Sequence, residues 1–338
     1  MARIIAPKTC SQLPRIALTL GDPAGIGPEI TLAAATDPAV RARCTPVIVG
    51  SEEILARVAA ALGRALPSWA EVGQGSDDTV ELVEVPVAGL AEVQPGQVSA
   101  PGGRAAEAYL RRACELCAEG LCDAVTTAPL HKSSLRLAGI EDIGHTEILA
   151  RLLPAAEEPL TLFICEKLRI FFFSRHLSLR AAIDAIDGPK VEAFLRRVDE
   201  VLVRPGAARP RIALAALNPH GGDDGQFGDE EILHLAPAVA ACRGAGLDVH
   251  GPIPADAVFH QGLEGRWDCV VALYHDQGHI ASKTRDFYGT VTATLGLSVL
   301  RTSVDHGTAF DLAWKGRANA QSMSAATLAA VELLDARR

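Results

Sequence analysis

The chain has 338 residues, of which 49% are hydrophobic, 22% are charged and only 4% are aromatic. A core of Ala, Val, Leu and Ile is typical of α/β proteins with parallel sheets, and this length favours two lobes with a cleft for a small ligand. The formal net charge of −9 argues against binding to nucleic acid or anionic membranes, which needs clustered Lys and Arg. An anionic substrate would therefore require a local cationic pocket.

The sequence predicts a cytoplasmic protein. It contains no run of 18 apolar residues, and its first nine residues lack an apolar segment, so we expect neither a spanning helix nor a secretory signal. The eight cysteines do not have the spacing of a disulfide framework. Cys114 and Cys117, with Cys122 nearby, lie in a helical pattern, and we interpret them as core thiols rather than metal or redox groups.

Apolar runs and helical patterns alternate along the chain. We expect strands at residues 15–20, 46–50, 123–128, 160–164, 168–173, 211–217 and 268–274, and helices at 52–62, 103–118, 191–203 and 231–246. This alternation predicts βαβ units around a mostly parallel sheet. The two runs within 160–173 are close enough to form an antiparallel hairpin, so the sheet should be mixed. Residues 67–101, rich in Pro, Gly, Gln and Asp, are expected to form a surface excursion.

Two glycine-rich segments invite a comparison with phosphate-binding loops. The first, GDPAGIGPE at 21–29, precedes a helix opened by Pro28, whose free amides could receive an anion. Its spacing is not the dinucleotide fingerprint, and a tight structural turn is the favoured interpretation. The second, GGDDGQFGDEE at 221–231, carries five carboxylates that would repel phosphate.

Three histidines follow predicted strands: His176, His220 and His275. The carboxyl ends of strands face the binding crevice in α/β sheets, so these side chains could converge in space. Neutral imidazoles are favoured ligands of Zn, Fe, Co or Ni, and three protein ligands leave coordination positions open for a substrate. Each histidine alone has an ordinary structural alternative, and the metal-site prediction depends on the trio.

A cationic and hydrogen-bonding set also lies near glycine-rich strand ends. It comprises Lys132, His145 with Thr146, Lys283 and Arg301. In a chain this acidic, such residues could hold a phosphate or a carboxylate. The alternative for each is a solvated charge or a structural ion pair.

A series of motifs stands in the order and approximate spacing of a known family: GDPAGIGPE, TAPLHK, AGI-x(3)-GHTE, LNPHGG with FGDEE, PADAVF, YHDQG and RTSVDHGTA. On these motifs the chain resembles the 4-hydroxythreonine-4-phosphate dehydrogenase family over essentially its whole length. The resemblance implies a two-lobed α/β/α fold related to isocitrate and isopropylmalate dehydrogenases, a homodimer, and an active site in the cleft between the lobes. We expect one lobe at residues 1–133 plus 305–338 and the other at 134–304.

The resemblance also implies roles for matching positions. His176, His220 and His275 correspond to ligands of one divalent metal (Zn, Mg, Co or Mn), drawn from both subunits. The substrate-binding positions correspond to His145, Thr146, Lys283 and Arg301, whereas Thr292 stands where the family carries a substrate-binding Asn. Loss of that amide leaves the identity of the substrate open. The segments at 275–279 and 310–323 look closer to the branch acting on 4-phospho-D-threonate and 4-phospho-D-erythronate than to the vitamin B6 branch.

The expected function is a metal-dependent NAD or NADP dehydrogenase that oxidises the C3 hydroxyl of a 4-phosphorylated hydroxy acid, with subsequent decarboxylation. Lys283, Asp256 and Asp276 are candidates for the proton acceptor or for a partner that orients a metal ligand. The cofactor-binding residues are not assigned. The alternatives are a metal-dependent hydrolase or lyase acting on a small anion, and a non-catalytic sugar-acid binding protein.

Overall fold

The computed structural model describes residues 13–153, 155, 157–203 and 208–336, so Cys10 lies outside the described residues. Two compact units divide the chain: the described residues within 1–154 and 299–336, and those within 155–298. The sequence-based boundaries after residue 133 and before 305 differ from these. Helices α5 (Lys132–Leu137) and α6 (His145–Leu152) pack on α4 (Ala100–Ala118), and β12 (Leu300–Val304) pairs with β5 (Ala124–Thr127), so all of them belong to the first unit.

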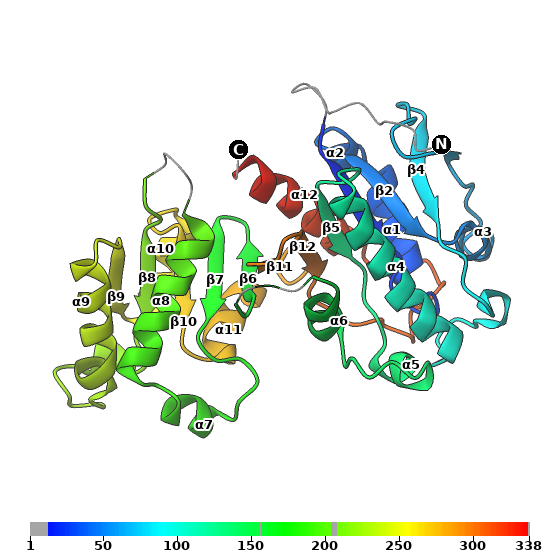
Figure 1. Cartoon of the computed structure of the whole chain (residues 1–338). Helices are drawn as coiled ribbons and strands as arrows, with labels where there is room; N and C mark the ends of the chain where they lie inside the picture. The colour runs from blue at the N-terminus through cyan, green and yellow to red at the C-terminus, as the bar shows by residue number, and fades with distance from the viewer. Residues whose placement is uncertain (1–12, 154, 156, 204–207, 337–338) are drawn as a thin grey trace. The chain divides into compact units, whose positions relative to one another are not determined.

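The first unit is built on parallel strands in the order β3-β4-β2-β1-β5-β12. β1 spans Arg15–Thr19 and β2 spans Thr45–Gly50; both are almost fully buried, which explains their continuous apolar sequences. α4 packs across β1, β2 and β5, and α12 (Gln321–Asp335) packs against β12 and α1 (Gly27–Thr36) (Figure 1). The shorter helices are α2 (Pro38–Arg41) and α3 (Glu52–Ala61).

The segment 67–101 departs from the sequence-based expectation. It contributes β3 (Ser68–Ala70) and β4 (Thr79–Glu84) to the edge of the sheet, followed by a 3-10 turn at Leu90–Glu92. The prediction of a surface excursion was therefore wrong for these two strands. Strands at an edge bury less surface than central ones, so β3 and β4 lack the long apolar runs that identified β1 and β2.

The second unit has the strand order β11-β6-β7-β10-β8-β9. β6 (Leu160–Cys165) is antiparallel to β7 (Leu168–Phe172) and to β11 (Val291–Leu295), which confirms the predicted hairpin and mixed sheet. β7, β10 (Cys269–Ala272), β8 (Ile212–Ala215) and β9 (Val249–Ile253) are mutually parallel. The α/β class predicted from the sequence is confirmed.

Helices surround these strands (Figure 1). α10 (Ala255–Leu263) and α11 (His275–Arg285) contact each other and pack against β7 and β10, whereas α8 (Gly188–Leu202) packs with α9 (Ala236–Gly244). A π-helical turn at Glu231–Leu235 leads into α9, and α7 spans Leu179–Asp184. The core of this unit contains Phe163, Phe172 and Trp267 together with Phe259 of α10.

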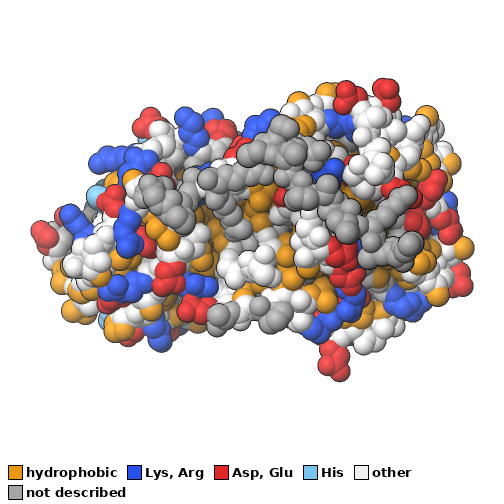
Figure 2. Space-filling view, turned by 45° about the horizontal axis from the view of Figure 1, so that its top comes forward, with side chains coloured by type: hydrophobic (Ala, Val, Ile, Leu, Met, Phe, Trp, Pro, Cys, Tyr) orange, Lys and Arg blue, Asp and Glu red, His pale blue; other side chains and the backbone are white. Residues whose placement is uncertain are grey.

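The cysteines are mostly buried, as the helical pattern around Cys114 and Cys117 predicted for core thiols. The described cysteines form no disulfide with one another; Cys114 and Cys122 are buried and Cys117 is half-buried, although Cys122 lies just beyond the end of α4. On the face seen in Figure 2, basic and acidic side chains are interspersed. Within the part of the chain that the structure describes, no helix is long and apolar enough to cross a membrane.

Candidate active site

The three candidate metal ligands follow three neighbouring strands of the second unit. β7, β10 and β8 lie side by side and run parallel, so their carboxyl ends share one edge of the sheet. His176 follows β7, His275 follows β10 and begins α11, and His220 follows β8. The ring centroids of His176 and His275 are 6.4 Å apart. The three histidines therefore follow strand ends at one edge of the sheet, where the rings of His176 and His275 are neighbours.

Asp256 joins the same edge. β9 is the next parallel strand beyond β8, and Asp256 lies in the first turn of α10, which follows β9. Its side chain is exposed. A carboxylate is thus available beside the strand end that precedes His220.

Asp276 fixes the orientation of the His275 ring. Its Oδ1 lies 2.6 Å from Nδ1 of His275. A carboxylate that accepts the Nδ1 proton leaves Nε2 as the lone-pair donor, which is the usual arrangement behind a metal-bound histidine. The ring also stacks on His279 at 3.8 Å, and Nδ1 of His279 donates to the carbonyl oxygen of His275 over 2.9 Å. The sequence pattern did not predict that His279 supports His275.

Gln277 ties two of the strand ends together. This buried side chain accepts a hydrogen bond from the Leu273 amide (2.7 Å) and donates to the Ala216 carbonyl (2.8 Å), joining the end of β10 to the end of β8. The Ser174 hydroxyl donates to the Leu273 carbonyl (2.9 Å) and joins the end of β7 to the same point. The sequence signal for Gln277 is its place directly after the His275–Asp276 pair.

The first unit holds a separate cationic site. Arg301 on β12 is buried and donates through Nε (3.1 Å) and Nη2 (2.8 Å) to the hydroxyl of Thr127. Burial lowers the pKa of Arg301 to about 10, so it stays charged at neutral pH. Burial, reinforced by the Arg301 charge, holds the pKa of His145 well below its usual value, so His145 is neutral. A fixed cation beside a neutral imidazole can bind an anion and a hydroxyl. Thr146 follows on α6 and is exposed.

The other two predicted substrate residues belong to the second unit. Lys283 lies two turns beyond His275 on α11, about 12 Å along the helix axis, with Nζ 5.5 Å from the centre of the Phe287 ring. Thr292 is buried in β11, opposite Phe163 of the antiparallel strand β6. Lys283 thus lies on the helix that follows β10, whereas Thr292 lies on β11, which pairs with β6 outside the parallel group that carries the histidines.

The GDPAGIGPE segment is a tightly packed turn. A Cβ at Gly21 would lie 2.1 Å from the Pro129 carbonyl oxygen, and one at Gly27 would lie 2.1 Å from that of Leu20. Pro28 stands in the first turn of α1, as expected. The glycines thus allow close backbone packing, which agrees with the structural interpretation of this motif.

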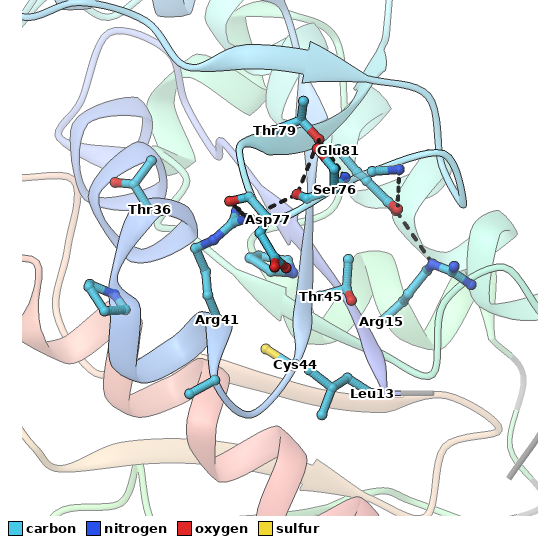
Figure 3. A pocket seen from close by; sticks show the side chains of 14 residues that line it. Leu13, Arg15, Thr36, Arg41, Cys44, Thr45, Ser76, Asp77, Thr79 and Glu81 are labelled. Carbon is cyan, nitrogen blue, oxygen red and sulfur yellow. Dashed lines mark hydrogen bonds and ion pairs between the residues drawn. The ribbon is translucent and has the colours of Figure 1, made fainter. Parts of the chain in front are cut away.

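A cavity of about 690 Å³ lies in the first unit, at the amino-terminal ends of its strands (Figure 3). Arg15 and Thr45, the first residues of β1 and β2, line it, so it opens at the amino ends of the strands. The Arg41 guanidinium donates to the carbonyls of Ser76 and Asp77. Ligands of α/β sheets bind at the opposite, carboxyl edge, and the cavity is therefore not the candidate active site.

Comparison with known proteins identifies the family. The model of the family described as "Pyridoxal phosphate biosynthetic protein PdxA" matches residues 42–330. The chain belongs to the PdxA family. This membership confirms the resemblance seen in the ordered motifs.

Proteins of known name match over nearly the whole chain. A Symbiobacterium thermophilum protein named "Putative D-threonate 4-phosphate dehydrogenase" is 46% identical over 317 residues, covering 93% of this chain and 94% of its own length. A 4-hydroxythreonine-4-phosphate dehydrogenase from Klebsiella pneumoniae is 42% identical with a TM-score of 0.85, covering 96% of this chain and 99% of that one. A terephthalate 1,2-cis-dihydrodiol dehydrogenase from Burkholderia xenovorans is 29% identical with a TM-score of 0.63, covering 93% and 98%.

In this PdxA-family chain the three candidate histidines do not by themselves form a metal-like cluster among the described residues. Among the residues that the structure describes, no three His, Cys, Asp or Glu side chains are arranged to hold a metal ion. His176 and His220 are exposed and His275 is half-exposed, so all three are accessible from outside the unit. The donor set, three imidazoles with one ring oriented by a carboxylate, fits Zn²⁺ or Co²⁺ better than Mg²⁺, which prefers oxygen ligands.

Proposed function

We propose that this chain is a metal-dependent NAD or NADP dehydrogenase that oxidises the C3 hydroxyl of a 4-phosphorylated hydroxy acid, with decarboxylation following. The observation that carries the proposal is the emergence of His176, His220 and His275 from neighbouring parallel strand ends. Support comes from relatives of 46% and 42% identity whose names describe dehydrogenases of two such phosphates.

We infer that 4-phospho-D-threonate is the preferred substrate. The relative with 46% identity is named for that compound. Thr292 offers a hydroxyl where the resemblance implies an amide, and a hydroxyl cannot reproduce the amide's separate donor and acceptor positions. 4-Phospho-D-threonate carries a hydroxyl at C2, whereas 4-hydroxy-L-threonine 4-phosphate carries an ammonium group, so a change of polar partner suits a change of substrate.

The reaction requires two groups that the protein would bind. A divalent cation would lower the pKa of a coordinated hydroxyl, and the oxidised nicotinamide would accept the hydride. Oxidation at C3 gives a β-keto acid, which loses its carboxylate as CO₂; 4-phospho-D-threonate would yield dihydroxyacetone phosphate. Loss of CO₂ makes the overall reaction effectively irreversible.

The described residues suit these roles. His176, His220 and His275 would hold the cation, with Asp276 orienting His275. Arg301 and the neutral His145 would bind anionic and hydroxyl groups, with Thr146, Lys283 and Thr292 as further substrate contacts. Lys283 and Asp256 are the candidate proton acceptors. The exposure of His176 and His220 supports a homodimer in which the partner subunit completes the site. The several buried thiols suit a reducing compartment and so support a cytoplasmic location.

The test is a side-by-side assay with Zn²⁺ or Co²⁺ and either nicotinamide. We expect absorbance of the reduced nicotinamide to rise with 4-phospho-D-threonate, and more slowly with 4-hydroxy-L-threonine 4-phosphate. If neither phosphate reduces the nicotinamide, the dehydrogenase proposal is wrong. Hydrolysis or cleavage of a phosphate would then support the hydrolase or lyase alternative, and saturable binding without turnover would support a sugar-acid binding protein.

A further inference from the structure

The loop that carries His220 is anchored by one buried carboxylate, that of Glu231 at the start of the π-helical turn. Glu231 is 3% exposed. Its Oε1 accepts hydrogen bonds from the backbone amides of Leu217 (2.7 Å) and Asn218 (2.8 Å), and its Oε2 accepts one from the Asn218 side-chain amide (2.8 Å). Glu231 thus fixes both the backbone and the side chain of Asn218, which lies two residues before His220.

Hydrogen bonds keep the Glu231 carboxylate negatively charged. Burial alone would raise the pKa of Glu231, but the hydrogen bonds from Asn218 and Leu217 outweigh burial and hold that pKa below its usual value. The charged group therefore accepts three donors at neutral pH. The sequence placed Glu231 among five carboxylates that would repel phosphate, but in the structure its side chain turns inward to the backbone.

The anchored loop has a backbone that ordinary residues avoid. His220 has φ +54°, and Gly221, Asp223 and Asp224 follow with φ of +70°, +44° and +53°. Left-handed residues are disfavoured when they carry a Cβ, so such a run persists only where the surroundings hold it. Pro219 offers no amide to bond, and the nearest side-chain anchor before the run is therefore the Asn218–Glu231 pair.

The packing around that pair leaves little freedom. A Cβ at Gly228 would lie 2.5 Å from Nδ2 of Asn218, and one at Gly222 would lie 3.0 Å from Oε2 of Glu231. Glu230 adds a second acceptor, 2.6 Å from the same Asn218 amide. The loop is wrapped closely around the two side chains, so their positions determine the path of the backbone into His220.

We propose that Glu231 is a positioning residue for the metal site: by holding Asn218 and the left-handed run, it presents the His220 imidazole for coordination. This inference rests on the proposed function, because it takes His220 as a metal ligand. Residues behind metal ligands contribute by restricting them before the metal binds, and their loss typically weakens metal binding about 10- to 100-fold.

The experiment measures Co²⁺ binding to the metal-stripped, full-length protein in its native oligomeric state. Visible absorption of Co²⁺ reports ligand geometry, and competition with a chelator gives the Kd. The variants are Glu231→Ala, Glu231→Gln and His220→Ala. The matched control is Glu81→Gln, since Glu81 is also 3% exposed and also accepts backbone amides, from Gly73 (3.0 Å) and Gly75 (3.3 Å), but in the first unit (Figure 3).

We expect Glu231→Ala to raise the Kd for Co²⁺ by about 10- to 100-fold and to change the visible spectrum. Glu231→Gln keeps the two backbone contacts and should lose less than about 10-fold. Glu81→Gln should leave both the Kd and the spectrum unchanged, even if its unfolding temperature falls.

Two results distinguish a wrong role for Glu231 from a wrong assignment of the metal site. If Glu231→Gln and Glu231→Ala, folded by circular dichroism, bind Co²⁺ as the wild type does while His220→Ala loses binding, Glu231 has only a structural role and the inference is overturned. If the wild type shows no saturable binding, or His220→Ala binds equally well, the proposed metal site itself is wrong.

Discussion

Gly278 of α11 lies directly against the ring of Phe172 at the end of β7. A Cβ at position 278 would come within 2.6 Å of Cε1 of that ring. Only glycine therefore lets α11 approach β7 this closely, and α11 begins with His275 while β7 leads to His176. The separation of 6.4 Å between those two imidazoles depends on this contact.

Replacing Gly278 with alanine should destabilise the protein by about 1–3 kcal/mol, because overpacking forces neighbouring side chains from their rotamers. Chemical denaturation measures the loss, and the double variant Gly278→Ala with Phe172→Leu should recover part of it. Gly244→Ala is the control: Gly244 is also helical, but a Cβ there meets nothing within 4 Å. That variant should be at least as stable as the wild type, and equal stability of Gly278→Ala would contradict the prediction.

Gln277→Leu should lower the free energy of unfolding by at least about 2 kcal/mol. The change leaves the Leu273 amide and the Ala216 carbonyl without their buried partner, and each such group costs about 1–3 kcal/mol. Urea denaturation is the measurement. Gln261→Leu removes a single, half-buried hydrogen bond from Trp267 and should cost less. Similar losses in the two variants would argue against a special role for Gln277.

His220→Ala should abolish turnover while leaving the fold intact. Loss of a metal that contributes several kcal/mol of charge stabilisation corresponds to a decrease of roughly a thousandfold in kcat/KM. Steady-state kinetics and circular dichroism test the two parts. His260→Ala, which alters an exposed histidine of α10 that pairs with Glu264 just beyond the helix, should retain wild-type activity. Full activity of His220→Ala would remove His220 from the metal site.

Thr292→Asn should shift substrate preference. Restoring the amide implied by the resemblance should raise the ratio of kcat/KM for 4-hydroxy-L-threonine 4-phosphate over 4-phospho-D-threonate by about 10-fold, the effect of one good hydrogen bond. Thr294→Asn, two residues further on the same face of β11, is the matched control. An unchanged ratio in Thr292→Asn, or an equal shift in the control, would show that position 292 does not select the substrate.

The Asp268–Arg211 pair should make stability depend on acid pH. Burial raises the pKa of Asp268, but hydrogen bonds from the Arg211 guanidinium and amide outweigh this effect and lower the pKa below its usual value. A pKa lower in the folded than in the unfolded state gives stability above about pH 4, which is lost as the pH falls through the folded value.

Asp268→Asn should therefore have a lower unfolding temperature than the wild type near neutral pH, and the difference should narrow as the pH falls below about 4. Thermal scans across this range provide the test. Asp335→Asn, which removes one exposed contact to Arg43, should have a smaller effect at every pH. A gap for Asp268→Asn that stays constant with pH would contradict the assignment.

The sequence predicted the strands that are buried and apolar, but not those that mix polar and apolar residues. β12 contains Arg301 and Thr302, which interrupt the apolar run; they are buried because Arg301 bonds Thr127 and Thr302 bonds Thr126 (2.9 Å). β9 contains a Gly-Pro step and a register shift, which break its pattern. Such strands depend on partners distant in sequence, and no local pattern encodes these.

In the candidate site, too, some residues could be predicted from local pattern and others depend on distant partners. The histidines could be selected because each ends or follows an apolar run, and the order of parallel strands brings those ends to one edge. Gln277 and Glu231 could not be assigned, because Gln277 bonds a carbonyl 61 residues away and Glu231 bonds amides 13 and 14 residues away. Their function is to hold the backbone, and only the folded chain reveals it.

The bonds from the buried acid Glu231 back to residues 217 and 218 have a practical consequence for protein engineering. A chimera that exchanges this segment between two members of the family must carry Asn218 and Glu231 together, since a grafted loop without its own acid would leave the amides at 217 and 218 unsatisfied. The segment should therefore be exchanged as a whole, with the junctions of a chimera placed before residue 217 and after residue 231.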